Sequence, residues 1–155
     1  MPVSETIRRI EAVLIRCGVQ SITKEYGANG ETAALRFEIV TNLDRPPHMI
    51  RLPANKEQAL EALWKDYVGD EKLSTDGQSL AWGSYKRKKK KDFVEQAERT
   101  AWKLMQDWTE VQLSLVAFKQ AEVLEVFMPY IWDGRQTLFQ ELKAGGFKAL
   151  PERCE

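Results

Sequence analysis

The chain has 155 residues, 43% of them apolar, which is the length and composition of one globular domain with a sizeable core. Basic and acidic side chains number 23 each, so the formal charge is zero and the strongly basic character of a histone-like or ribosomal protein is excluded. The charge is nevertheless unevenly spread: residues 1–85 carry net −2, residues 86–91 carry +6, and residues 92–155 carry −4.

Two features indicate the expected environment of the chain. Cys17 and Cys154 lie near opposite ends without a histidine cluster, so the sequence predicts neither a disulfide framework nor a zinc site, and we expect no cofactor. Residues 1–16 lack the apolar core of a secretory signal, and no stretch approaches the roughly 18 apolar residues that a membrane span needs. We therefore expect a cytoplasmic protein that does not enter a membrane.

The N-terminal third predicts a helix followed by strands. Apolar side chains recur every three or four positions up to Gly18, which predicts an amphipathic helix capped by Ser4. The period then changes to two, which favours strands with one buried face. These strands form a three-stranded antiparallel meander, with a hairpin turn at residues 27–30. Its expected strands are residues 22–26, 33–41 and 48–52.

Residues 55–150 are expected to complete the first structural unit and to form a linker and a second unit. Asn55 is expected to cap a helix that covers the apolar face of the sheet and completes a small α+β unit over residues 1–68. Residues 69–92 lose this periodicity and collect glycine, serine and aspartate before the basic run, so they are interpreted as a mobile basic linker. We expect residues 93–150 to form a helical unit that packs on the first, giving one compact domain overall.

A long helix with a heptad-like stripe is the strongest pattern in the chain. From Ala97 onward its apolar positions alternate between spacings of four and three, with Phe93 another four residues before, which predicts that they form one buried seam. These positions are Phe93, Ala97, Ala101, Leu104, Trp108, Val111, Leu115 and Phe118. Trp102 lies off that seam and is expected to pack on the sheet or on another chain.

Two further apolar groups predict helices after the seam, near residues 123–131 and 138–142. They would complete a C-terminal helical hairpin or bundle. The predicted fold class is therefore α+β: N-terminal helix, three-stranded antiparallel meander, covering helix, then helical hairpin or bundle.

Several short motifs together resemble a family of small uncharacterised proteins of bacterial phages, prophages and other mobile elements. The resemblance spans roughly residues 19–150. It implies a genomic setting in which accessory proteins often act on DNA, and it brings no known activity or catalytic residue. The motifs that carry it are Tyr26-Gly27, Arg51-Leu52-Pro53-Ala54-Asn55, Glu98-Arg99-Thr100-Ala101-Trp102, Asp107-Trp108-Thr109-Glu110 with Gln112, and Phe127-Met128-Pro129-Tyr130 followed by Thr137-Leu138.

The basic run is the candidate nucleic-acid site. Its six cations are Lys86, Arg87, Lys88, Lys89, Lys90 and Lys91. Phosphate contacts would release counterions, and the nearby Trp82 and Tyr85 could stack on unpaired bases of DNA or RNA. Such a run is too blunt to read a base sequence. An acidic protein partner, an anionic lipid surface and a merely solubilising tract are the alternatives.

No pattern predicts catalysis. His48 is the only histidine and follows two prolines, and the carboxylate pairs Glu57/Glu61 and Glu122/Glu125 have the spacing of solvated helix faces. We therefore expect a non-enzymatic accessory protein that binds nucleic acid without sequence preference. The alternative function is a structural or protein-interaction module that assembles through the long helix, including as a homodimer.

Overall fold

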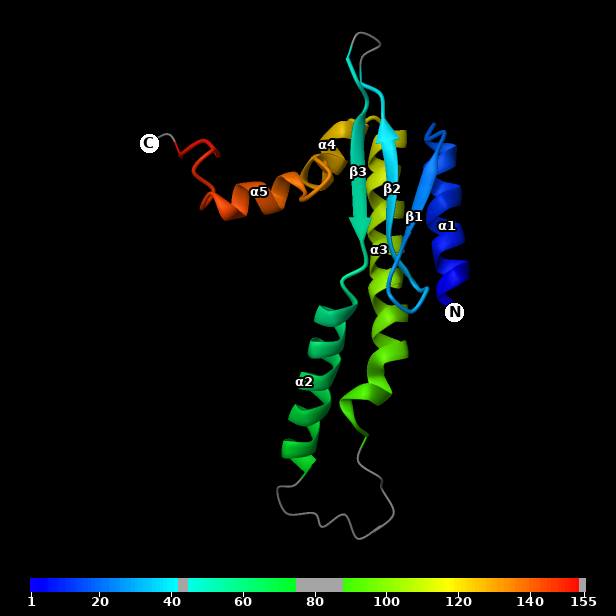
Figure 1. The fold of residues 1–155 in the computed structure, drawn as a ribbon, viewed down its shortest axis with the longest axis vertical. Helices are drawn as coiled ribbons and strands as arrows, with labels where there is room; N and C mark the ends of the chain where they lie inside the picture. Colours follow the sequence, from blue (N-terminus) through cyan, green and yellow to red (C-terminus); the bar gives the residue numbers. More distant parts are fainter. Residues whose placement is uncertain (42–44, 75–87, 154–155) are drawn as a thin grey trace.

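The computed structural model describes residues 1–41, 45–74 and 88–153, with residues 70–74 described by backbone only. It confirms the α+β class, with a helix, a three-stranded antiparallel sheet and then further helices (Figure 1). The elements are α1 (Val3–Arg16), β1 (Ile22–Tyr26), β2 (Thr32–Ile39), β3 (His48–Pro53), α2 (Lys56–Ser74), the 3-10 turn η1 (Lys90–Phe93), α3 (Val94–Ala117), α4 (Val123–Phe127), the 3-10 turn η2 (Met128–Tyr130) and α5 (Leu138–Ala144).

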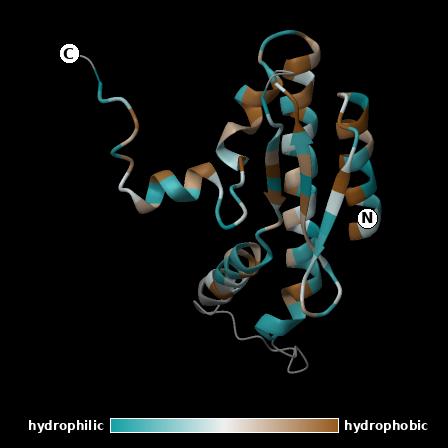
Figure 2. Ribbon diagram, turned by 45° about the horizontal axis from the view of Figure 1, so that its top comes forward, coloured by the Kyte–Doolittle hydropathy of each residue, from teal (hydrophilic) through white to brown (hydrophobic). Residues whose placement is uncertain are grey.

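The sheet has the order β1-β2-β3, and its register sorts the side chains into two faces. Leu35 and Phe37 of β2 face the core together with Ile50 and Leu52 of β3, their cross-strand partners. The alternate positions form the outer face, which carries Arg36, Glu38 and Arg51 but also Ala34, Met49 and Pro53. The alternation of apolar and polar residues is visible along the strands in Figure 2.

One core joins the two predicted units. Ile10 and Leu14 of α1, the inner face of the sheet, and Trp102 and Leu113 of α3 belong to a single buried cluster, which Phe127 of α4 closes. Phe37 and Phe127 meet edge to face with ring centroids 5.2 Å apart. Because the cluster draws on both halves of the chain, the protein has one hydrophobic core.

The covering helix differs in detail from the expectation. α1 and α3 cover the apolar face of the sheet, whereas α2 extends past the end of the sheet and packs alongside α3 as a helical hairpin (Figure 1). α2 also continues to Ser74, so residues 69–74, expected to begin the linker, are helical. The helix α1 begins at Val3, with Pro2 rather than Ser4 at its N-cap.

The predicted seam is buried only in its N-terminal part, at Phe93, Ala97 and Ala101, and a different face of α3 is buried farther along the helix. Trp102, which was placed off the seam, is completely buried, as is Thr109, and Gln106 and Leu113 lie on the same face. These four positions also repeat at spacings of four, three and four. Two of them are polar, so the pattern of apolar residues alone misses this buried face.

The C-terminal segment is shorter in helix than predicted. α4 has five residues, and Ile131 and Trp132 then run antiparallel beside β3, with Trp132 N donating to Met49 O at 2.8 Å. α5 projects from the body and packs mainly on η2 (Figure 1). Thr137 caps α5 through a reciprocal pair of hydrogen bonds with Gln140.

Candidate functional site

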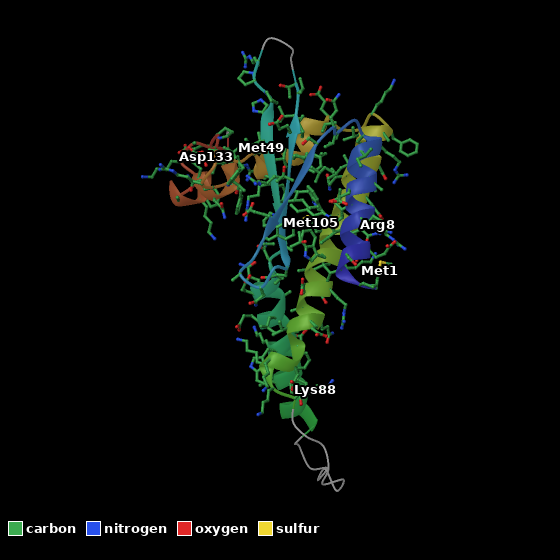
Figure 3. All side chains as sticks on the ribbon, turned by 45° about the vertical axis from the view of Figure 1, so that its right-hand side comes forward. Met1, Arg8, Met49, Lys88, Met105 and Asp133 are labelled. Carbon is green, nitrogen blue, oxygen red and sulfur yellow. The ribbon has the colours of Figure 1, made fainter. Side chains whose placement is uncertain are left out.

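An aromatic cluster holds the far end of the α2–α3 hairpin together, where the basic run meets η1. Trp64 and Tyr67 of α2 contact Phe93, with ring centroids 6.2 and 5.2 Å from it. The Lys88 backbone N–H donates to the Tyr67 hydroxyl at 3.0 Å. Figure 3 labels Lys88 at this end, far from the sheet, so the described lysines occupy the tip of the hairpin.

The structure describes four lysines of the basic run, Lys88 to Lys91, and two of them are engaged within the chain. The Lys88 ammonium lies over the Phe93 ring, 5.7 Å from its centroid, and the Lys90 ammonium forms an ion pair with Glu61 of α2. Lys89 and Lys91 have exposed side chains. The tip therefore presents the exposed cations of Lys88, Lys89 and Lys91 to an anionic partner, whereas the charge of Lys90 is offset by Glu61.

The helix start is compatible with this charge. A run of cations is unfavourable at a helix N-terminus, where the macrodipole is positive. Here the Asp92 carboxylate accepts a 2.7 Å hydrogen bond from the Lys89 backbone N–H and so caps η1. The acidic cap lies between the lysines and α3, and it offsets the unfavourable placement.

The other predicted binding residues lie outside the described part of the chain. They are Trp82, Tyr85, Lys86 and Arg87. The prediction that aromatic side chains there stack on bases is therefore untested. The aromatic residues that the structure does place near the lysines are Trp64, Tyr67 and Phe93, and their rings pack against one another.

A second surface was not recognised as exposed by the sequence pattern. Much of the predicted seam faces solvent on the side of α3 opposite Trp102, and we call this line of side chains the α3 ridge. Its members and their exposed fractions are Leu104 (62%), Val111 (58%), Leu115 (40%) and Phe118 (77%). Exposed apolar residues are common singly, but a continuous line at heptad spacing is a sign of an interaction surface.

Beside the ridge, the first turn of α2 and the middle of α3 enclose a small apolar hollow. Its volume is about 310 Å³, and Ala59, Ala101, Leu104, Met105 and Trp108 contribute to its walls. Trp108 is half-buried and packs edge to face on Phe127 and Tyr130, at 5.7 and 5.2 Å. Burial at this site also raises the pKa of the Tyr130 hydroxyl. Because Ala101 has a small side chain, the hollow opens next to the ridge.

A larger groove of about 850 Å³ separates α5 from the body, lined by Trp108, Leu115 and Phe139 with several glutamine side chains. Catalytic groups do not converge on it: His48 lies at the start of β3 and is not among its lining residues. The described residues bring together no three His, Cys, Asp or Glu side chains able to hold a metal ion. Glu61 pairs with Lys90, and Glu125 accepts a 3.5 Å hydrogen bond from the Glu122 backbone at the start of α4.

The outer face of the sheet holds a further charged cluster. Arg51 of β3 donates two 3.0 Å hydrogen bonds to Glu25 of β1, and the Arg36 guanidinium of β2 lies over Trp132, 5.2 Å from the ring centroid. Arg51 thereby holds the pKa of the Glu25 carboxyl below its ordinary value, with Arg36 adding a smaller effect. The Glu25 carboxylate offsets part of the charge of the two guanidinium groups, and the cluster ties the three strands together.

Comparisons with family models, curated proteins and solved structures find no match. The resemblance to proteins of phages and mobile elements therefore stays a prediction. None of the described helices is long and apolar enough to cross a bilayer.

Proposed function

We propose that the protein is a non-enzymatic structural module that works by self-assembly through the α3 ridge. The observation that carries the proposal is the exposure of four large apolar side chains in one line along α3. Each would lose contact with water in a helix pair, at a gain of up to about 25 cal/mol per Å² of apolar surface. None of the four ridge side chains belongs to the core cluster of the single chain.

The spacing of the ridge favours a helical partner over an irregular one. From Ala101 to Phe118 the apolar positions alternate between intervals of three and four, which matches the repeat by which two helices interlock side chains. In the genomic setting that the sequence resemblance implies, such a module would be an accessory component of a phage or mobile element.

Sedimentation equilibrium over a range of protein concentrations tests this function. We expect the wild-type chain to form dimers and Val111→Asp to remain monomeric, because a carboxylate would be buried in the middle of the pair. The Val111 side chain is exposed in the single chain, so the helical circular dichroism of the Val111→Asp variant should match that of the wild type. Gln96→Asp, an exposed polar position of α3 away from the ridge, is the matched control. A wild-type monomer at every concentration would reject self-assembly.

A second candidate function is sequence-tolerant binding of DNA or RNA by the hairpin tip. It is supported by the exposed side chains of Lys89 and Lys91, which lie next to Lys88 at the tip of the hairpin, whereas the sequences on both sides of the basic run are net acidic. Even if all six cations of the run contact phosphates, the slope of log K against log salt should be no steeper than about −5. Binding should therefore be weak and readily removed by salt.

Titration of a labelled single-stranded oligonucleotide at several salt concentrations checks this second function. We expect Lys89→Gln/Lys91→Gln to weaken binding several-fold and to flatten the salt slope by about two. Lys143→Gln/Lys148→Gln removes the same charge from exposed positions far from the tip and should leave the affinity nearly unchanged. Equal effects of the two double variants would show that only net charge matters.

A further inference from the structure

We infer that the groove between α5 and the body is a binding site for a proline-rich peptide segment of another protein, held in the polyproline II conformation. The inference goes beyond the proposed self-assembly, because it rests on residues that are not part of the α3 ridge. The site is supported by the fixed base of α5, by the aromatic rings that line the groove, and by side-chain amides that lack partners within the chain.

The groove exists in the single chain because hydrogen bonds fix the base of α5. Trp132 is bonded to β3, and the turn that follows it closes in a bridge between Trp132 and Thr137. The Asp133 carboxylate accepts two backbone N–H groups within this turn. Leu138 N, at the start of α5, donates to Ile131 O at 2.7 Å. α5 therefore projects from an anchored base (Figure 1), and a ligand would not have to order the groove before binding.

Aromatic rings from three elements line the groove. Trp108 of α3 and Tyr130 of η2 meet at an interplanar angle of 63°, with ring centroids 5.2 Å apart, and Phe139 of α5 is 49% exposed. Rings at such an angle offer a slot with two apolar sides, which suits a proline ring better than the single flat platform on which a sugar stacks. The smaller hollow of about 310 Å³ shares Trp108, Tyr130 and Pro53 with the groove, so the two form one elongated site.

Neutral hydrogen-bonding groups line the same groove. The side-chain amides of Asn55, Gln58 and Gln112 make no hydrogen bond to another described residue. Gln140 accepts a backbone N–H through its side-chain oxygen, which leaves its NH2 group to donate. The Tyr130 hydroxyl is a further donor on the lining. The groove therefore presents donors beside apolar rings to a ligand that carries acceptors.

The charge of the lining favours a neutral ligand. Its ionisable side chains of opposite sign are Glu125 and Lys143, so the groove offers no excess of either charge to a nucleic acid or an acidic peptide. A polyproline II segment is neutral and apolar, and its carbonyl groups are free because this conformation has no internal hydrogen bonds. Proline also lacks an N–H group, so such a segment needs donors from its partner and few acceptors.

Other peptide conformations fit the groove less well. The backbone groups of an α-helix are already paired internally, so the amides that a helix covered would lose water without gaining a partner. An added β-strand requires an open strand edge. Pro53 is the one lining residue that belongs to a strand, and it has no N–H to donate.

NMR titration of the full chain tests the site. An unlabelled oligoproline of about ten residues is added to dilute isotope-labelled protein, and amide shifts report binding. We expect a Kd on the order of 100 μM, with the largest shifts in α5 and around Trp108. Phe139→Ala and Gln112→Ala should each weaken binding about fivefold. Neither side chain is buried, so both variants should keep the fold.

The matched controls are Phe118→Ala and Gln96→Ala, which remove an exposed ring and an exposed amide outside the groove. They should leave the affinity within about twofold of the wild type. Four results would overturn the inference: no shifts at millimolar oligoproline, equal binding of a glycine-serine peptide of the same length, equal losses in the control variants, or shifts caused by maltohexaose and not by oligoproline. The last would mean a carbohydrate site. Sedimentation measures self-assembly separately, so failure of one proposal is distinguishable from failure of the other.

Discussion

Arg51 and Glu25 join the two outer strands across β2 through a pair of 3.0 Å hydrogen bonds. Neither side chain is fully exposed, and both lie on the face of the sheet that no helix covers. The pair therefore stabilises a sheet of only three strands on the face opposite the hydrophobic core. Its loss should be measurable as a change in the free energy of unfolding.

Replacing Glu25 should couple stability to pH. At pH 7 we expect Glu25→Gln to lose about 1 kcal/mol in urea unfolding, a value lowered from that of a buried charged hydrogen bond by the partial exposure of the pair. Because Arg51 lowers the pKa of Glu25 in the folded chain, the stabilisation is complete above the ordinary value of 4.5 and is lost as the pH falls through the folded pKa. The two proteins should converge in acid. Glu38→Gln, exposed on the same face, should show no such convergence.

Substitutions on the buried and the exposed faces of α3 should differ sharply in their effect on the free energy of unfolding. Trp102→Ala removes a completely buried indole and should cost about 3–5 kcal/mol. Leu104→Ala should change the unfolding free energy by less than about 0.5 kcal/mol in dilute protein, where the chain is monomeric. Denaturant unfolding at low protein concentration compares the two. Equal costs would contradict the exposure of Leu104 in the single chain.

The cap of α5 should control the order of the C-terminal segment. Thr137→Ala removes the side-chain oxygen that accepts from the Gln140 backbone N–H and should cost about 1 kcal/mol locally. Amide hydrogen exchange should therefore speed up across α5 and remain unchanged in α3. Ser4→Ala, at a position where the structure has no cap, is the control and should leave exchange in α1 unaltered.

Burial of Tyr130 beside Trp108 should be detectable in alkaline solution. The difference in ultraviolet absorbance between the wild type and Tyr130→Phe isolates the titration of this hydroxyl, and its midpoint should lie above the ordinary pKa of 10.0. Since the unfolded chain ionises this group more readily than the folded chain, stability should decrease as the pH rises beyond that value. A midpoint at or below 10.0 would contradict the burial of this side chain.

The sheet was predictable because its strands and turns are determined by residues that are neighbours in the sequence. The turn at residues 27–30 and the alternation along β2 each depend on neighbours in sequence, and the observed strands agree with the expected ranges within a few residues. The orientation of α3 was not predictable in this way. It carries two stripes of similar spacing, and only the sheet and α1 determine that the stripe containing Gln106 and Thr109 is the buried one.

The candidate site likewise has one part that the sequence predicts and one part that depends on tertiary contacts. The basic run is evident from the sequence, but the partners of its lysines are not. Glu61 reaches Lys90 from another helix, and Phe93 lies beneath Lys88 only because η1 folds against α2. The exposed ridge could have been suspected from the presence of more apolar positions on α3 than a single buried face can accommodate.

The single core has a consequence for how the chain could be divided. The sheet and α1 come from residues before 75, whereas Trp102, Leu113 and Phe127 come from residues after 87. Trp64, Tyr67 and Phe93 hold α2 to α3 independently of the peptide that connects them. Two fragments cut between these segments would each lack half of the core and should recover the fold by complementation, which makes the protein a natural candidate for a split reporter.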